Sequence, residues 1–201
     1  YPTKNESIQK WGGYRVLWDF YHTFDKNDKR LEVLVGEFVG TDGALYNEEN
    51  PGTVLQTGAM PVKYGEDPAA TGEESQVDWI VYRYADVLTL LSEAIVRQNN
   101  TITGEALDLL NQVRTRAGIP AYTLSDIKDV QDFLDKVLEE RGHELWFEGA
   151  RRTDLIRHGK YIEYARKYRN SVAAQDYMNL MPLPQSVINE SKGQVIQNPG
   201  Y

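Results

Sequence analysis

Apolar residues recur at helical spacing in the second half of the chain. Tyr84, Leu88, Leu91 and Ile95 form the stripe of an amphipathic helix that ends near Gln98. A second stripe begins after a short polar connection, at Thr103 or Gly104, and is closed by Gly118 and Pro120, a typical C-terminal cap and stop. Two helices joined by so short a connection lie antiparallel, so the pattern predicts a helical hairpin.

A third and longer helix is predicted from a cap at Ser125-Asp126 to Phe147, before Gly149. Its inward stripe is made of Ile127, Val130, Leu134 and Leu138, and then continues through Arg141, Leu145 and Glu148. The same face of one helix therefore carries both apolar residues and two charges. Shorter helical segments are expected at 154–158, 162–168 and 185–190.

The two inward charges predict an internal network of ion pairs. A buried guanidinium or carboxylate costs several kcal/mol unless it is paired and hydrogen-bonded. The nearest partners in the sequence complete the predicted structural network: Arg141, Glu144, Glu148, Arg151, Arg152 and Asp154. The alternative is a catalytic acid and base among Glu140, Glu144 and Glu148, which stand at successive i, i+4 positions. We favour the structural network, because arginines are interleaved with these acids and would keep them ionised.

Residues 1–80 have a different character, with many Gly, Asp, Asn and aromatic residues and little helical periodicity. The segment 30–39 has a strand-like composition, and Thr41-Asp42-Gly43 supplies a turn before 44–46, which makes a β-hairpin plausible. We therefore predict a mostly α fold with helical hairpins, divided into an irregular region of loops and short strands, 1–80, and a helical region, 81–201. The two regions are expected to form one structural unit.

Composition and charge exclude several classes of protein. The 201 residues are enough for one domain with a sizeable core. A net charge of −8 argues against nucleic-acid binding, which needs Lys/Arg-rich surfaces. No stretch approaches the roughly 18 consecutive apolar residues of a membrane helix. The absence of cysteine excludes disulfides, thiolate metal sites and thiol nucleophiles within these residues.

Motifs for catalysis or for cofactors are missing from the sequence. His22, His143 and His158 are far apart, and His143-Glu144 lacks the second histidine of a zinc-protease helix. The segment 25–30 begins like a calcium loop but lacks the required glycine, and a solvated turn is the better interpretation. Neither a nucleophile elbow nor a phosphate-binding glycine loop is present. We predict that the chain is not an enzyme and that it has no catalytic residue, metal or cofactor.

Aromatic residues provide the best candidates for ligand binding. They are concentrated between residues 11 and 24, in a glycine-bearing region that the pattern predicts to be non-helical. An exposed aromatic ring on a loop can bind the apolar face of a sugar or a peptide side chain. For most of these residues, packing into the core is the competing interpretation. The candidates by residue type and loop position are Trp11, Tyr14, Trp18, Tyr21 and Tyr46.

Four segments, in this order, resemble the SusD/RagB family of surface lipoproteins that capture nutrients. They are VYRYADVLTLLSEA at 81–94, LNQVRTRAG at 110–118, ERGHELWFEGARRTDLIRHG at 140–159 and NLMPLPQSVINESKGQVIQNPGY at 179–201. The resemblance covers roughly residues 60–201. It implies tetratricopeptide-like helical hairpins and no catalytic activity. No binding motif of the family maps residue by residue onto this sequence, so the resemblance leaves the candidate ligand residues as they stand.

The resemblance also implies a function and a location. Such a protein binds an oligosaccharide without reacting on it, at the bacterial outer membrane, and delivers it to a SusC-like TonB-dependent channel. The family is anchored through a lipidated cysteine that this chain lacks, so we expect the 201 residues to be the C-terminal portion of a longer lipoprotein. Peptide capture by the same architecture is one alternative. A helical scaffold for protein partners and a carboxylate-based hydrolase are the others.

Overall fold

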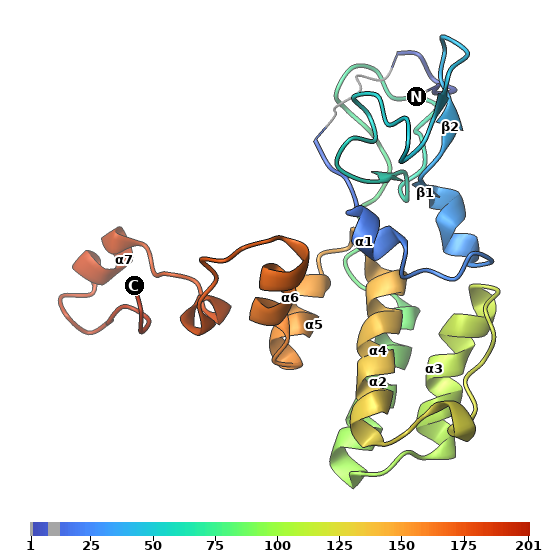
Figure 1. The fold of residues 1–201 in the computed structure, drawn as a ribbon. Helices are drawn as coiled ribbons and strands as arrows, with labels where there is room; N and C mark the ends of the chain where they lie inside the picture. Colours follow the sequence, from blue (N-terminus) through green and yellow to red (C-terminus); the bar gives the residue numbers. More distant parts are fainter. Residues whose placement is uncertain (1, 8–12) are drawn as a thin grey trace. The chain divides into compact units, whose positions relative to one another are not determined.

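The computed structural model describes residues 2–7 and 13–201. The chain forms two compact units, Tyr1–Ala150 and Arg151–Tyr201 (Figure 1). The predicted fold class is confirmed, because helices dominate and the N-terminal region is rich in loops and very short strands. The expectation that 1–80 and 81–201 are two regions of one structural unit stays a prediction.

Three helices build the helical part of the first unit: α2 (Tyr84–Asn99), α3 (Gly104–Arg116) and α4 (Val130–Leu145). They lie side by side, and α2 and α3 form the predicted hairpin (Figure 1). Thr103 caps α3 by accepting a hydrogen bond from the amide of Ala106 at 3.1 Å. The side chains between the helices form an apolar core: Val96, Ala106, Leu107, Leu110, Ile127, Phe133, Leu134 and Val137.

The bounds of α4 differ from the prediction at both ends. Asp129, rather than Ser125 or Asp126, is the N-cap, because its carboxylate accepts from the amide of Asp132 at 2.9 Å. The residues before it form a separate 3₁₀ turn, η2 (Leu124–Asp126), and an extended Ile127. At the other end the chain leaves the helix after Leu145, and Phe147 takes a left-handed conformation with φ 62°.

The described residues of the N-terminal region form six short elements: α1 (Trp18–Tyr21), η1 (Lys29–Val33), β1 (Leu34–Val35), β2 (Phe38–Val39), β3 (Leu45–Tyr46) and β4 (Met60–Pro61). Strand β2 pairs antiparallel with β3, which confirms the predicted hairpin, and β1 pairs antiparallel with β4. The predicted strand over 30–39 is wrong in its first part, because Asp28 caps a 3₁₀ turn there. The prediction that the aromatic-rich segment is non-helical is wrong at α1, which is a short helix.

A second apolar core holds this region at the end of α4. Its buried members are Phe24, Leu34, Ala59 and Trp146. Val16 and Ala59 exchange backbone hydrogen bonds of 2.9 and 2.8 Å. Gly58 permits this close approach, since a Cβ atom at its position would lie 2.0 Å from the carbonyl oxygen of Val16. The pairing fixes Val16, two residues after Tyr14 in the chain.

The second unit consists of short helices: α5 (Arg151–Arg157), α6 (Tyr161–Tyr168), η3 (Asp176–Asn179) and α7 (Gln185–Glu190). Helix α6 packs against both α5 and η3, and Leu155 and Ile162 are buried. Near the end of the chain, the Gln197 side chain bonds both the amide and the carbonyl of Leu183, at 2.8 and 3.0 Å. Within the described residues, no helix has the length and apolar character that crossing a membrane requires.

Candidate binding site

Two buried glutamates of α4 bind arginines from distant parts of the first unit. Glu140 accepts from Arg30 at 2.7 Å and from Arg114 at 2.9 Å. Glu144 accepts from Arg30 at 3.0 Å and also pairs with Arg83 and Arg116. The side chains of Glu140 and Glu144 are only 1% and 2% exposed. Each negative charge is thus taken up by at least two guanidinium groups.

Arg30 connects the turn before β1 to α4. Its guanidinium bonds Asp28 at 2.6 Å through Nη2, while Nη1 reaches Glu140 and Glu144. Burial by itself lowers the pKa of Arg30, but the hydrogen bond to Asp28 and the charge of Glu140 outweigh it and raise the pKa above its ordinary value. The guanidinium therefore stays charged while almost completely buried.

Glu148, just beyond the end of α4, is held by two cations. Arg83 donates to both of its carboxylate oxygens, at 2.7 and 2.8 Å, and Lys63 also pairs with it. Burial by itself raises the pKa of Glu148, but the hydrogen bonds from Arg83 and Lys63 outweigh it and hold the pKa below its ordinary value. Burial lowers the pKa of Lys63. Glu148 is thus ionised in the folded protein.

Arg141, the other inward charge of α4, binds α2. Its Nη1 lies 2.7 Å from a carboxylate oxygen of Asp86 and donates to the hydroxyl of Thr89 at 2.8 Å. Arg141 is 3% exposed, so the pair crosses between two packed helices. The partners that the structure gives to Arg141 and Glu148 include residues 55 and 65 positions away in the sequence.

The remaining residues of the predicted network belong to the second unit. There Asp154 accepts from Arg157 at 2.9 Å, Arg152 donates to the carbonyl of Asn179 at 3.2 Å, and Arg151 lies over the ring of Tyr164. Six residues that join the network lie far from α4 along the chain and are not among the predicted ones: Asp28, Arg30, Lys63, Arg83, Arg114 and Arg116. The arrangement of these charges is that of a network that joins α4 to its neighbours.

The lowered pKa of Glu148 leads to a prediction about pH. A carboxyl group with a lower pKa in the folded state binds fewer protons there than in the unfolded state, so it stabilises the fold at neutral pH. That contribution should be lost as the pH falls from about 4.5, the ordinary value, through the lower pKa of the folded state. Denaturant unfolding at pH 7 and pH 3 measures the loss. Glu148→Gln should show a smaller loss than the wild type, whereas exposed Glu190→Gln should match the wild type.

The candidate aromatic residues lie in different environments. Trp11 falls outside the described residues. Trp18 and Tyr21 are partly buried against the second core and contact each other edge to face at 5.3 Å between ring centroids. Tyr46 stacks on Phe38 and donates to Asp42 at 2.6 Å, so its ring is engaged in the hairpin. Tyr14 has the most exposed ring of the four, at 72%.

Tyr14 belongs to an aromatic cluster assembled from four separate segments. Phe147 contacts Tyr14 at 5.6 Å, Trp79 at 5.9 Å and Tyr64 at 6.2 Å between ring centroids. Tyr64 and Trp79 stack at 4.6 Å with only 13° between their planes. Trp79 is 59% exposed. We call Tyr14, Tyr64, Trp79 and Phe147 the aromatic platform.

The platform is fixed by the charged network beside it. Phe147 lies between Trp146, which is buried in the second core, and Glu148, which binds Lys63 and Arg83. A left-handed conformation costs a residue other than glycine about 1–2 kcal/mol, so this position needs strong support from its neighbours. The sequence analysis missed Trp79 and Phe147. Trp79 follows an exposed polar loop, which was a usable signal, whereas Phe147 was assigned to the third helix.

Comparison with protein families identifies the chain. The model of the SusD family matches residues 17–201. The chain belongs to the SusD family. The match begins well before residue 60, where the resemblance in the sequence begins. It therefore includes α1 and most of the N-terminal region of this SusD family member.

Several relatives are known. The chain is 29% identical over 141 residues to the starch-binding protein SusD of Bacteroides thetaiotaomicron, covering 67% of this chain and 23% of that protein. It is 38% identical over 90 residues to the SusD-like protein P38 of Formosa agariphila, covering 42% of this chain and 18% of that one. The chain therefore spans about a quarter or less of the length of these curated relatives.

Solved structures show the same fold. Surface glycan-binding protein A of Bacteroides thetaiotaomicron superposes with a TM-score of 0.62 at 25% identity, over 99% of this chain and 44% of that one. A SusD superfamily protein of Parabacteroides distasonis gives 0.65 at 25% identity, over 92% of this chain and 41% of that one. The fold of this chain is thus a SusD fold.

Proposed function

We propose that this protein binds an oligosaccharide non-covalently at the bacterial cell surface and that the aromatic platform contacts the sugar. The observation that carries the proposal is a pair of exposed aromatic residues, Tyr14 and Trp79, whose rings both contact the ring of Phe147. Two rings on one support offer flat apolar area to the C–H faces of successive sugar residues. Membership in the SusD family and the names of two relatives, a starch-binding and a surface glycan-binding protein, support the ligand class.

The mechanism of binding is shape and stacking rather than reaction. The carboxylates near the platform, Glu144 and Glu148, are occupied by Arg83, Arg116 and Lys63 and serve the fold. Rings held in advance by neighbouring side chains lose little freedom when the ligand binds. The cost of ordering is therefore small, but stacking alone gives only modest affinity. A modest affinity suits a protein that captures a glycan and then releases it.

Release would be to a membrane channel. As in the resemblance noted above, we propose delivery to a SusC-like TonB-dependent outer-membrane importer, with the whole lipoprotein held at the outer membrane by a lipid anchor. Family membership supports this part of the proposal. Co-purification of the native protein from solubilised outer membranes should recover the channel. Recovery of the native protein only from the soluble fraction would contradict it.

One observation favours a second function, a helical surface for a protein partner. Helix α2 packs on α3 and α4, yet its other face is apolar as well, with Tyr84, Val87 and Leu91 exposed at 71%, 55% and 44%. A helix that is apolar on all sides is normally buried. This face needs none of the platform residues, so variants of the platform test glycan binding separately from it.

Replacing Trp79 tests the proposed glycan site. Trp79→Ala removes one of the two exposed rings and should weaken the binding of a glycan ligand by about 10- to 100-fold, the range for a well-packed aromatic contact. Isothermal titration with maltoheptaose, cellohexaose and laminarihexaose measures the dissociation constants. Tyr82→Ala is the matched control, because Tyr82 is 83% exposed and close in the sequence but lies outside the platform.

The thermal unfolding midpoint of each variant shows whether a loss of binding comes from the site or from the fold. Tyr14→Phe should bind like the wild type, because it retains the ring, and Tyr14→Ala should bind as weakly as Trp79→Ala. Unchanged affinity in both alanine variants, with the fold intact, would exclude the platform as the glycan site. Tighter binding of peptides than of any of the three glycans would favour peptide capture instead.

A further inference from the structure

The second unit contains a groove of about 630 Å³ whose lining includes no residue of the aromatic platform. It is lined by Gly159, Ile162, Glu163, Arg166, Lys167, Asp176 and Asn179. The volume lies within the range of about 300–1,000 Å³ that is typical of small-ligand pockets. All seven residues belong to the second unit, so this groove is complete within one compact part of the chain.

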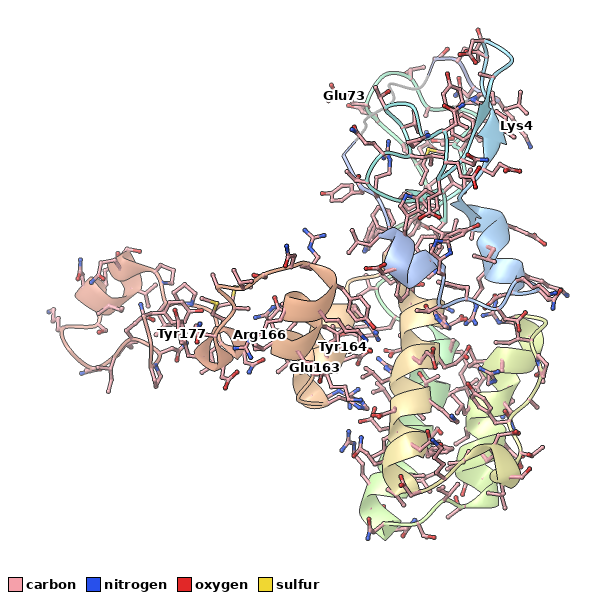
Figure 2. All side chains as sticks on the ribbon, viewed as in Figure 1. Lys4, Glu73, Glu163, Tyr164, Arg166 and Tyr177 are labelled. Carbon is pink, nitrogen blue, oxygen red and sulfur yellow. The ribbon has the colours of Figure 1, made fainter. Side chains whose placement is uncertain are left out.

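The groove lies between α6 and η3. Ile162, Glu163, Arg166 and Lys167 are spaced i, i+1, i+4 and i+5, which places them on one side of α6. Asp176 and Asn179, the first and last residues of η3, supply the opposite side. Figure 2 shows Arg166 on the side of α6 that faces η3, where Tyr177 lies. Ile162 is 6% exposed and provides an apolar floor.

Two polar side chains of the groove are held by hydrogen bonds within the second unit. Arg166 donates through Nε and Nη2 to the carbonyl of Ala174, at 3.0 and 2.7 Å, and lies 3.7 Å from Asp176. The side-chain amide of Asn179 donates to the carbonyl of Asp176 at 2.9 Å. Because Arg166 and Asn179 already have these partners, their placement costs a ligand little entropy. Glu163 and Lys167 are exposed on α6 and accessible to a ligand.

The charges of the groove indicate the class of ligand. Glu163 and Asp176 supply two carboxylates, Arg166 and Lys167 supply two cations, and Asn179 is neutral, so the lining carries no net charge. An anionic or a cationic ligand would meet a group of its own sign as often as one of the opposite sign. A neutral ligand with many hydroxyl groups, in contrast, can donate to the carboxylates and accept from the cations. Its C–H faces can lie on Ile162.

We propose that this groove is a second carbohydrate-binding site, which takes a short, neutral oligosaccharide. The inference rests on the proposed glycan-binding function for its ligand class, but it uses none of the platform residues. For a polysaccharide long enough to reach both sites, the second contact is intramolecular. Two modest affinities then give tighter retention of a long glycan than of a short one.

The test removes the groove contacts in a protein that already lacks the platform. Trp79→Ala with Tyr14→Ala is the background, and Glu163→Gln with Lys167→Met removes one carboxylate and one cation from the groove, both on exposed side chains. Isothermal titration uses maltoheptaose, cellohexaose and laminarihexaose as neutral probes and tetragalacturonate as the anionic one. The background should still bind a neutral probe, and the groove substitutions should weaken that binding at least tenfold.

The matched control makes the same chemical changes outside the groove. Arg169→Met with Glu190→Gln, in the same background, should leave the affinity unchanged. Affinity for the neutral probes that does not respond to the groove substitutions would overturn the inference, as would tetragalacturonate binding more tightly than the neutral probes.

If the platform substitutions alone abolish all binding, the groove inference falls and the proposed function stands. If only the groove substitutions weaken binding, the platform assignment falls instead. If no neutral probe binds the wild type, both fall.

Discussion

Replacing Glu144 with alanine should lower the free energy of unfolding by about 3–5 kcal/mol, the cost of removing one partner from a buried ion network. Glu144 is 2% exposed and is the shared acceptor of Arg30, Arg83 and Arg116. Its removal leaves three guanidinium groups close together without the negative charge that offsets their mutual repulsion. The melting temperature should fall by on the order of 10 °C.

Denaturant titration of the variant measures this loss, and Glu139→Ala on the same helix is its control. Glu139 is exposed, and removing a surface carboxylate typically changes stability by less than about 1 kcal/mol. Glu144→Gln should also be destabilised, because an amide oxygen accepts hydrogen bonds but carries no negative charge. A loss below about 1 kcal/mol for Glu144→Ala would show that water or other acceptors replace the carboxylate, and the network would then have no structural weight.

The sequence predicts much of the helical architecture because the determinants are local. The stripe through Tyr84 and Ile95 and the cap at Thr103 place α2 and α3 within about a residue of their observed bounds. The start of α4 was predicted too early, because Ser125 and Asp126 have the residue types of a cap but belong to the separate turn η2, and Asp129 performs the capping. Which of several adjacent candidates caps a helix depends on the backbone conformation between them. Here Ile127 is extended, so the helix begins only after Asp129.

The partners of the charged residues could not be predicted in the same way. The apolar pattern of 127–148 predicts that Arg141 and Glu148 face inward, but it contains no information on which distant side chains meet them. The sequence therefore points only to the nearest charges along the chain, whereas Arg30 lies 110 positions from Glu140 and Arg83 lies 65 positions from Glu148. Contacts of this kind depend on how the elements pack, which a single sequence does not specify.

The same limit applies to the aromatic platform. Tyr14 was selected because it is an aromatic residue near glycines, and it does lie in the platform. Trp18 and Tyr21 share that composition, but they belong to the short helix α1 and pack against the second core. Phe147 reaches the platform because α4 ends at Leu145, two residues before the predicted end, and because Phe147 itself takes a left-handed conformation. Residue type selects candidates, and backbone geometry decides among them.

Arg30 should be as important to the fold as Glu144, because it connects two parts of the first unit that are separate in the sequence. Its guanidinium pairs with Glu140 and Glu144, so it joins the turn 28–33 to α4. Arg30→Met removes the charge and keeps most of the apolar length. We expect a loss of about 3–5 kcal/mol, because Asp28, which is 3% exposed, would lose the guanidinium of Arg30 as a donor and keep the hydrogen bond from the Arg30 backbone amide.

Arg30→Lys separates the role of charge from the role of the guanidinium shape. The planar fork of Arg30 bonds Asp28 through Nε and Nη2 and the glutamates through Nη1, whereas an ammonium group is a point charge at the end of a flexible chain. The lysine variant should therefore lose about 1.5–3 kcal/mol, the range for hydrogen bonds to charged groups. Denaturant unfolding should rank wild type above Arg30→Lys and Arg30→Lys above Arg30→Met, with exposed Lys26→Met as the control. A lysine variant as stable as the wild type would show that charge alone stabilises the contact between the turn and α4, and that the fork geometry of the guanidinium contributes nothing.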